Sequence, residues 1–167
     1  YDRKPGNILF HEGEARITDF GLSKQMDAAA GGASVPGPGG VSASGSDGGV
    51  ELTSQGAGTY WYLPPECFEV GEAPPKISAK VDVWSTGVIL YQMLFGRRPF
   101  GHDLTQEGIL RDHSVLSGQL LFPARPGVSD LAKSFLTACL TRSQAERPNI
   151  RALLQHPFIR AGRKALA

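Results

Sequence analysis

The sequence predicts a mainly α-helical domain with one small β-hairpin. Between residues 78 and 96, apolar side chains occur on every side of a 3.6-residue wheel, which is the pattern of a buried helix. A second apolar stripe recurs at helical spacing over residues 129–140, and two short apolar runs flank a turn within residues 8–18. A chain of 167 residues is long enough for one domain with a real core and too short for two large ones.

Composition excludes several broad classes of function. The 17 basic and 16 acidic residues give a formal charge of +1, so no overall charge indicates nucleic acid or an anionic membrane as a partner. Cys67 and Cys139 stand alone, and the four histidines have no ligand spacing, so we expect buried thiols of an intracellular protein and no Cys/His metal site. The longest apolar run is interrupted by polar residues, which argues against a transmembrane helix.

Polar residues flank the predicted hairpin in the sequence, before its first strand and after its second. Asp2, Lys4 and Asn7 precede its first strand, and Asp19 follows its second, so the hairpin should bring them to one end. Phosphoryl transfer needs a carboxylate near the attacking hydroxyl, a cation near the moving phosphate and oxygen ligands for Mg²⁺. These four side chains supply those types. The alternative is turn chemistry, in which Asp, Asn and Gly only shape loops.

The middle of the chain divides by composition. Residues 27–49 are almost entirely Gly, Ala, Ser, Pro and Asp, which cannot offset the entropy of ordering, so we expect a disordered insert. Residues 51–68 are instead rich in aromatic side chains and end in Pro64, Pro65 and Glu66.

The predicted buried helix follows. Ser78 can cap its start and Gly96 can end it. Since it has no polar face, we expect other elements to pack all around it, and its one early acid, Asp82, to find hydrogen-bond donors there. Further helices are expected at residues 105–111, 129–140 and 152–155. Ser129 is the expected N-cap of the second, and its apolar stripe comprises Leu131, Phe135, Leu136, Cys139 and Leu140.

Two motifs resemble those of eukaryotic protein kinases. The pattern D-x-K-x-x-N at residues 2–7, followed by D-F-G at residues 19–21, is similar to their catalytic loop and metal-binding motif. The resemblance implies that Asp2 orients the acceptor hydroxyl and takes its proton, that Lys4 meets the γ-phosphate of ATP, and that Asn7 and Asp19 hold Mg²⁺.

The same resemblance implies roles further along the chain. Thr59 matches a residue that contacts the catalytic-loop lysine in serine/threonine kinases, here Lys4, which favours Ser/Thr acceptors. P-P-E at residues 64–66 resembles the A-P-E motif, and Arg147 matches the arginine that pairs with its glutamate, here Glu66. An unpaired buried guanidinium would be costly, which is consistent with this pairing. Asp82 matches an aspartate that accepts hydrogen bonds from the backbone around the catalytic loop.

The long strings at residues 51–68 and 74–102 resemble the Tousled-like kinase family. That family comprises nuclear serine/threonine kinases associated with chromatin assembly, with histone chaperones among their substrates. Their self-association uses coiled coils that this chain lacks. Arg3 departs from the family, in which Leu is usual, and we expect the change to affect local packing at an apolar position rather than chemistry.

The resemblance refines the predicted fold to a mainly α, protein kinase-like C-terminal lobe. Its small hairpin would carry the catalytic loop and the DFG motif. Residues 1–160 would form a partial kinase domain and residues 161–167 a tail. The chain opens on Tyr1 within a motif and without an initiator Met, so we expect a fragment that lacks the N-terminal lobe and is inactive alone.

Two alternatives remain open. The chain could be a truncated, non-catalytic module that acts only by binding partners. A small-molecule phosphotransferase of kinase-like fold is disfavoured by residues 59–66 and by Arg147, which resemble the peptide-binding side of protein kinases.

Overall fold

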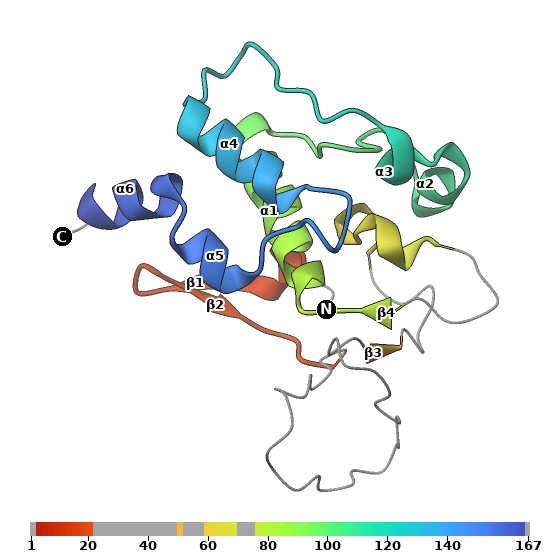
Figure 1. Ribbon diagram of the computed structural model, residues 1–167, viewed down its shortest axis with the longest axis horizontal. Coiled ribbons are helices and arrows are strands. Elements are labelled where there is room, and N and C mark those ends of the chain that lie inside the picture. Colours follow the sequence, from red (N-terminus) through yellow and green to blue (C-terminus); the bar gives the residue numbers. More distant parts are fainter. Residues whose placement is uncertain (1–2, 22–49, 52–58, 70–75, 166–167) are drawn as a thin grey trace, which may run out of the picture.

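A computed structural model describes residues 3–21, 50–51, 59–69 and 76–165, with helix α1 (Lys80–Phe95) at its centre (Figure 1). Helix α4 (Asp130–Cys139) packs against α1, and the hairpin lies towards the start of α1. The predicted insert at residues 27–49 and the predicted catalytic residue Asp2 lie outside the described residues.

The end of α1 agrees with the prediction, and its start lies two residues further on. Gly96 follows the helix with φ 69°, a left-handed conformation that glycine adopts without a Cβ clash. The helix begins at Lys80, after Ala79, and the hydroxyl of Ser78 accepts a long 3.4 Å hydrogen bond from the Lys80 amide. Ser78 therefore contacts the first turn without being the capping residue.

The expectation that α1 has no solvent face was wrong. Thr86 is exposed, and Met93 on the same side is 69% exposed. The opposite side is buried, including Trp84 and Val88 at 0% exposure. An apolar sequence indicates that a helix face avoids water, but it does not say which element covers that face.

The core consists of two larger clusters of buried side chains on α1. One joins α1 to the segment 59–69 and to α2 (Gln106–Asp112), and contains Tyr62, Trp84, Val88, Ile89, Phe100, Ile109, Val115 and Leu140. The other joins α1 to the C-terminal helices and contains Val83, Phe135, Cys139 and Leu153.

The crossing of α1 and α4 depends on a glycine. A Cβ atom on Gly87 would lie 2.7 Å from Cβ of Cys139, so the two helices can approach only because that position has no side chain. Ser129 caps α4 as predicted, since its hydroxyl accepts a 3.3 Å hydrogen bond from the Ala132 amide. Leu131 does not belong to the buried stripe, because it is 44% exposed.

The remaining helices are short. Helix α2 (Gln106–Asp112) begins after Thr105, which caps it, close to the predicted range of 105–111. Helix α5 (Ile150–Leu154) overlaps the range predicted at 152–155. Helices α3 (Ser114–Ser117) and α6 (Pro157–Ala165) were not predicted. Among the described residues, no helix combines the length and the apolar character needed to span a membrane.

The predicted hairpin is present. Strands β1 (Ile8–His11) and β2 (Glu14–Ile17) pair antiparallel, with Ile8 opposite Ile17, after the 3₁₀ turn η1 (Pro5–Asn7). A second pair, β3 (Val50–Glu51) with β4 (Lys76–Ile77), was not predicted, because two-residue strands are too short to show alternation. Between them lie the 3₁₀ turns η2 (Tyr60–Tyr62) and η3 (Pro65–Cys67).

Candidate active site

The hairpin brings the loop before β1 next to the residues after β2. The Thr18 amide donates a 2.8 Å hydrogen bond to the carbonyl oxygen of Asn7, and the Asn7 amide donates one of 3.0 Å to the carbonyl of Lys4. Asn7 is 8% exposed, so it is held at the base of the hairpin. Lys4, Asn7 and Asp19 therefore gather at one end of the hairpin.

Asp19 has an unusual backbone conformation. Its φ of 60° lies in the left-handed region, which non-glycine residues rarely adopt and which is concentrated at functional sites. Its Oδ1 accepts a 3.2 Å hydrogen bond from the Gly21 amide, and a Cβ on Gly21 would lie 3.2 Å from the same oxygen. The turn leaves the Asp19 side chain exposed, where it can reach a ligand.

Mg²⁺ is a ligand that these residues fit. Mg²⁺ binds oxygen atoms, and proteins hold it with one or two carboxylates together with substrate phosphates. Asn7 and Asp19 offer one amide oxygen and one carboxylate on adjacent backbone segments. No group of three or more His, Cys, Asp or Glu side chains in the described ranges could hold a metal, so this pair would depend on phosphate oxygens to complete the coordination.

The segment 59–69 is hydrogen-bonded to α1 beside this site. The Ser85 hydroxyl donates a 2.9 Å hydrogen bond to the carbonyl of Tyr62, and the Tyr62 hydroxyl donates one of 2.8 Å to Oε1 of Gln92. Burial raises the pKa of Tyr62 above its ordinary value, while Arg98, the hydrogen bond with Gln92 and Lys4 act in the opposite direction. Two hydrogen bonds therefore fix this segment against α1.

The outer part of the segment contacts the loop after α1. The indole Nε1 of Trp61 donates a 3.0 Å hydrogen bond to the carbonyl of Gly101, and the guanidinium of Arg98 lies 4.0 Å from the centre of the Trp61 ring. Thr59 precedes η2, and its carbonyl accepts a 2.9 Å hydrogen bond from the Tyr62 amide. Its contact with Lys4 stays a prediction.

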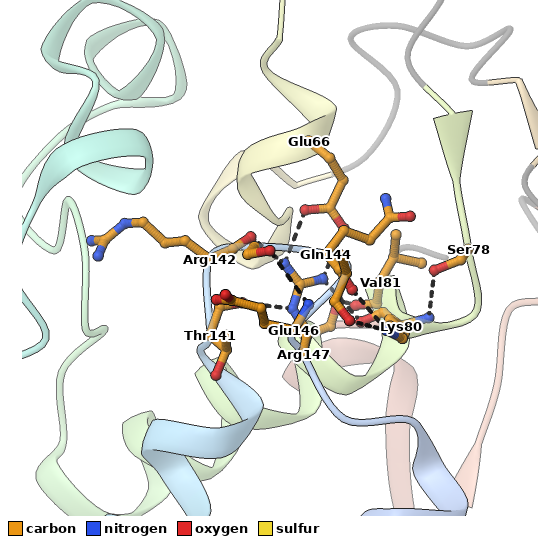
Figure 2. Close-up of polar contacts among 12 residues, drawn as sticks. Glu66, Ser78, Lys80, Val81, Thr141, Arg142, Gln144, Glu146 and Arg147 are labelled. Carbon is orange, nitrogen blue, oxygen red and sulfur yellow. Dashed lines mark hydrogen bonds and ion pairs between the residues drawn. The ribbon is translucent and has the colours of Figure 1, made fainter.

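Glu66 and Arg147 form a buried, two-pronged ion pair (Figure 2). Nη1 and Nη2 of Arg147 lie 2.7 and 2.9 Å from the two carboxylate oxygens of Glu66, and the residues are 0% and 5% exposed. The contact expected between these residues is therefore present. It joins η3 to the loop before α5 across 81 positions of sequence.

The remaining donors of Arg147 bind backbone carbonyls. Nε binds Thr141 at 2.9 Å, Nη1 also binds Lys80 at 3.2 Å, and Nη2 also binds Arg142 at 3.1 Å. Lys80 extends the network, because its ammonium donates to the carbonyls of Gln144 and Ala145. The first turn of α1, η3 and the loop before α5 are thus joined through one guanidinium (Figure 2).

Asp82 pairs with the side chain of Arg3. Nη2 of Arg3 donates a 3.1 Å hydrogen bond to Oδ2 of Asp82, and Nε lies 3.0 Å from Oδ1 without hydrogen-bond alignment. Burial alone would raise the pKa of the Asp82 carboxyl, but hydrogen bonds, that from Arg3 first among them, hold it below its ordinary value. The expectation that Arg3 occupies an apolar position was wrong, because its charged end finds a carboxylate.

Sequence reasoning missed Arg3, Ser85 and Gln92 as contributors to the site. Ser85 and Gln92 are polar residues within a strongly apolar helix, which could have indicated buried acceptors nearby. The signal at Arg3 was its departure from an apolar family position.

The hairpin gathers a lysine, an asparagine and an aspartate, and these are the side-chain types that phosphotransferases use. Residues 1–159 match the model of the protein kinase domain, so the chain belongs to the protein kinase domain family. It is similar to the serine/threonine-protein kinase TOUSLED of Arabidopsis thaliana, with 50% identity over 98% of this chain and 22% of that protein.

Animal relatives are similar to nearly the same degree. The human serine/threonine-protein kinase tousled-like 1 is 49% identical over 95% of this chain and 20% of its own length. The tousled-like 1 kinase of Caenorhabditis elegans is 45% identical over 96% of this chain and 16% of its own length. The chain spans about a fifth of these curated relatives.

Proposed function

We propose that the chain is the C-terminal lobe of a serine/threonine protein kinase that transfers the γ-phosphoryl group of ATP to protein substrates. The observation that carries this proposal is the hydrogen bond between Thr18 and Asn7, because it places the loop of Lys4 and Asn7 beside Asp19. Phosphoryl transfer depends mostly on positioning and charge neutralisation, and these side chains have the required chemistry.

Each of these side chains would have a separate role in phosphoryl transfer. Asp2 would orient the acceptor hydroxyl and receive its proton, and Lys4 would neutralise charge on the γ-phosphate. Asn7 and Asp19 would hold Mg²⁺, which supplies charge neutralisation to the phosphate oxygens when bound. Asp19 is exposed and Asn7 is buried, so Asp19 would bind Mg²⁺ from the surface and Asn7 would bind it from a fixed position in the loop.

The segment 59–69 would bind the protein substrate. Ser85 binds its Tyr62 carbonyl, its Trp61 indole binds the Gly101 carbonyl, and its Glu66 pairs with Arg147, so it can present a defined surface. The names of the Arabidopsis and human relatives describe serine/threonine kinases, which supports Ser or Thr as the acceptor.

The Tousled-like resemblance supports further proposals about context. Histone chaperones are the proposed substrates, and chromatin assembly in the nucleus is the proposed setting. We propose no nucleic-acid or membrane partner, and self-association only through regions outside this chain.

The test begins with the coding sequence upstream of Tyr1. The longer protein that it specifies should transfer phosphate from ATP to a histone chaperone, with phosphoserine or phosphothreonine as products. Asp2→Asn should reduce kcat by about 10²- to 10⁴-fold, because proton transfer to a positioned base contributes that much. Asp19→Ala should abolish transfer, and phosphotyrosine as the main product would contradict the assignment.

The alternative is a non-catalytic module that acts by binding partners. Exposed apolar side chains on the hairpin, Phe10 at 72% and Leu9 at 55%, are compatible with a surface that another polypeptide covers. If the longer protein binds ATP but transfers no phosphate under conditions in which a related kinase is active, this alternative is favoured.

A further inference from the structure

We propose that Arg3 is a positioning residue, which holds the loop of Lys4 and Asn7 against the first turn of α1 by pairing with Asp82. The proposal rests on the proposed function for its catalytic meaning, but the mechanical link can be tested without any activity.

The contact is short and links distant parts of the sequence. The two distances between Arg3 and Asp82 are 3.0 and 3.1 Å, and the residues are 79 positions apart. Arg3 directly precedes Lys4, so the backbone between the ion pair and the proposed phosphate-binding side chain is one peptide unit long. A displacement of Arg3 would therefore be transmitted to Lys4.

The partner of Arg3 lies on a rigid part of the molecule. Asp82 is in the first turn of α1, and the carbonyl of Lys80 in the same turn accepts a hydrogen bond from Arg147. The ammonium of Lys80 also binds two carbonyls in the loop that precedes Arg147. The first turn of α1 cannot shift without disturbing this buried network.

The first turn of α1 is thus joined to both the substrate-binding segment and the loop of Lys4 and Asn7. Through Arg147 it is joined to Glu66 and to the segment 59–69, and through Asp82 it is joined to Arg3 and the loop at residues 4–7. Fixing both to one turn sets the position of Lys4 relative to the proposed substrate-binding segment. Preorganisation of this kind is a main source of rate acceleration in phosphoryl transfer.

The size of the effect is limited by solvent. The side chains of Arg3 and Asp82 are 30% and 32% exposed, so water and salt screen part of the attraction. A partly screened, hydrogen-bonded ion pair should slow local opening of the loop by about fivefold.

Amide hydrogen exchange of the 167-residue chain tests the mechanical link. In Arg3→Leu, exchange at the hydrogen-bonded amides of Asn7 and Ile8 should be about fivefold faster, with no change in α4. Arg3→Lys, which keeps the charge and loses the second guanidinium contact, should give an intermediate rate. Arg16→Leu is the matched control, since it removes an exposed hairpin arginine that lies 3.8 Å from a carboxylate oxygen of the exposed Glu14.

Three outcomes would overturn the proposal. One is an unchanged rate at the amides of Asn7 and Ile8 in Arg3→Leu, and another is a uniform increase throughout the chain, which would indicate general destabilisation. The third is additivity with Asp82→Asn, because removal of Arg3 should have no further effect once its partner is neutral. If Asp82→Asn does not fold, the Arg3 variants alone decide.

A kinetic measurement in the longer protein tests the catalytic meaning. Arg3→Leu should lower kcat with little change in the KM for ATP, and Arg3→Lys should restore part of the loss. Lack of transfer by the wild type would contradict the proposed function and leave the exchange result to decide the role of Arg3. Wild-type kcat in Arg3→Leu would show that the link does not position Lys4.

Discussion

The guanidinium of Arg147 shows how one residue can organise a fold at a distance. Arginine has five N–H donors, and here they meet two carboxylate oxygens of Glu66 and three backbone carbonyls. Arg147 also lies 5.0 Å from the ring of Trp84. At 0% exposure, such a group is tolerated only because every donor has an acceptor.

Arg147→Ala should lower the free energy of unfolding by about 3 to 5 kcal/mol, because it leaves Glu66 buried without its partner and removes one hydrogen bond from each of three carbonyls. Urea denaturation measures the change. Arg151→Ala, at an exposed position on α5, is the control and should change stability by less than about 0.5 kcal/mol. Equal midpoints for Arg147→Ala and wild type would mean that the pair is not buried in solution.

Asp82 should make the fold sensitive to acid. Its folded-state pKa is lowered from an ordinary value of 3.8, so the stabilisation is fully present above pH 3.8 and is lost as the pH falls through the lower folded-state pKa. Asp82→Asn should have a lower free energy of unfolding than wild type at pH 6. The difference between the two proteins should be smaller at pH 2. Denaturation curves at both pH values test this, and a constant difference would exclude a role for ionisation of Asp82.

At the scale of elements, the crossing of α1 and α4 is a close contact that depends on Gly87. Gly87 faces Cys139 and Leu140, and both are almost fully buried. Burial raises the pKa of the Cys139 thiol to about 12, so this cysteine acts as a packing residue and not as a nucleophile. The second main cluster of the core, which includes Phe135 and Leu153, depends on the separation that Gly87 permits.

Gly87→Ala should destabilise the chain by about 1 to 3 kcal/mol, because the new methyl group would force α1 and α4 apart. Gly162→Ala on α6 is the control. No atom lies within 4 Å of the position that its Cβ would take, so the higher helix propensity of Ala should leave stability unchanged or slightly raised. Thermal unfolding compares the two, and a stable Gly87→Ala variant would show that the helices can separate without cost.

At the scale of the molecule, the proposed function needs two sets of residues. This chain would supply the catalytic and Mg²⁺-binding residues, and the kinase resemblance assigns the other nucleotide-binding residues to an N-terminal lobe. In the proposed function, Asn7 and Asp19 would supply ligands for Mg²⁺, and Lys4 would supply a cation for the terminal phosphate. The resemblance places the glycine-rich loop and the lysine that holds the α- and β-phosphates outside the chain.

The 167-residue chain alone should therefore not phosphorylate casein or histones in the presence of ATP and Mg²⁺. Its signal should equal that of the Asp19→Ala chain, which serves as the background. Transfer well above this background, and lost in Asp19→Ala, would show that the chain holds ATP productively by itself.

Much of this protein could be predicted from local sequence. The hairpin, the glycine at the end of α1 and the caps at Thr105 and Ser129 depend on residues within a few positions of one another, so their signals are contained in short stretches. The spacing of Lys4, Asn7 and the DFG motif predicted the candidate site. Glu66 and Arg147 were paired through the kinase motifs that contain them.

The tertiary structure alone decided the contacts between distant elements. The pairing of Arg3 with Asp82, the hydrogen bond from Ser85 to Tyr62 and the exposure of Met93 depend on how α1 lies against its neighbours. Hydropathy records which side chains avoid water, and charge records which ones need a partner, but neither specifies the partner. For residues 23 to 79 positions apart, that choice is made only when the helices and loops pack.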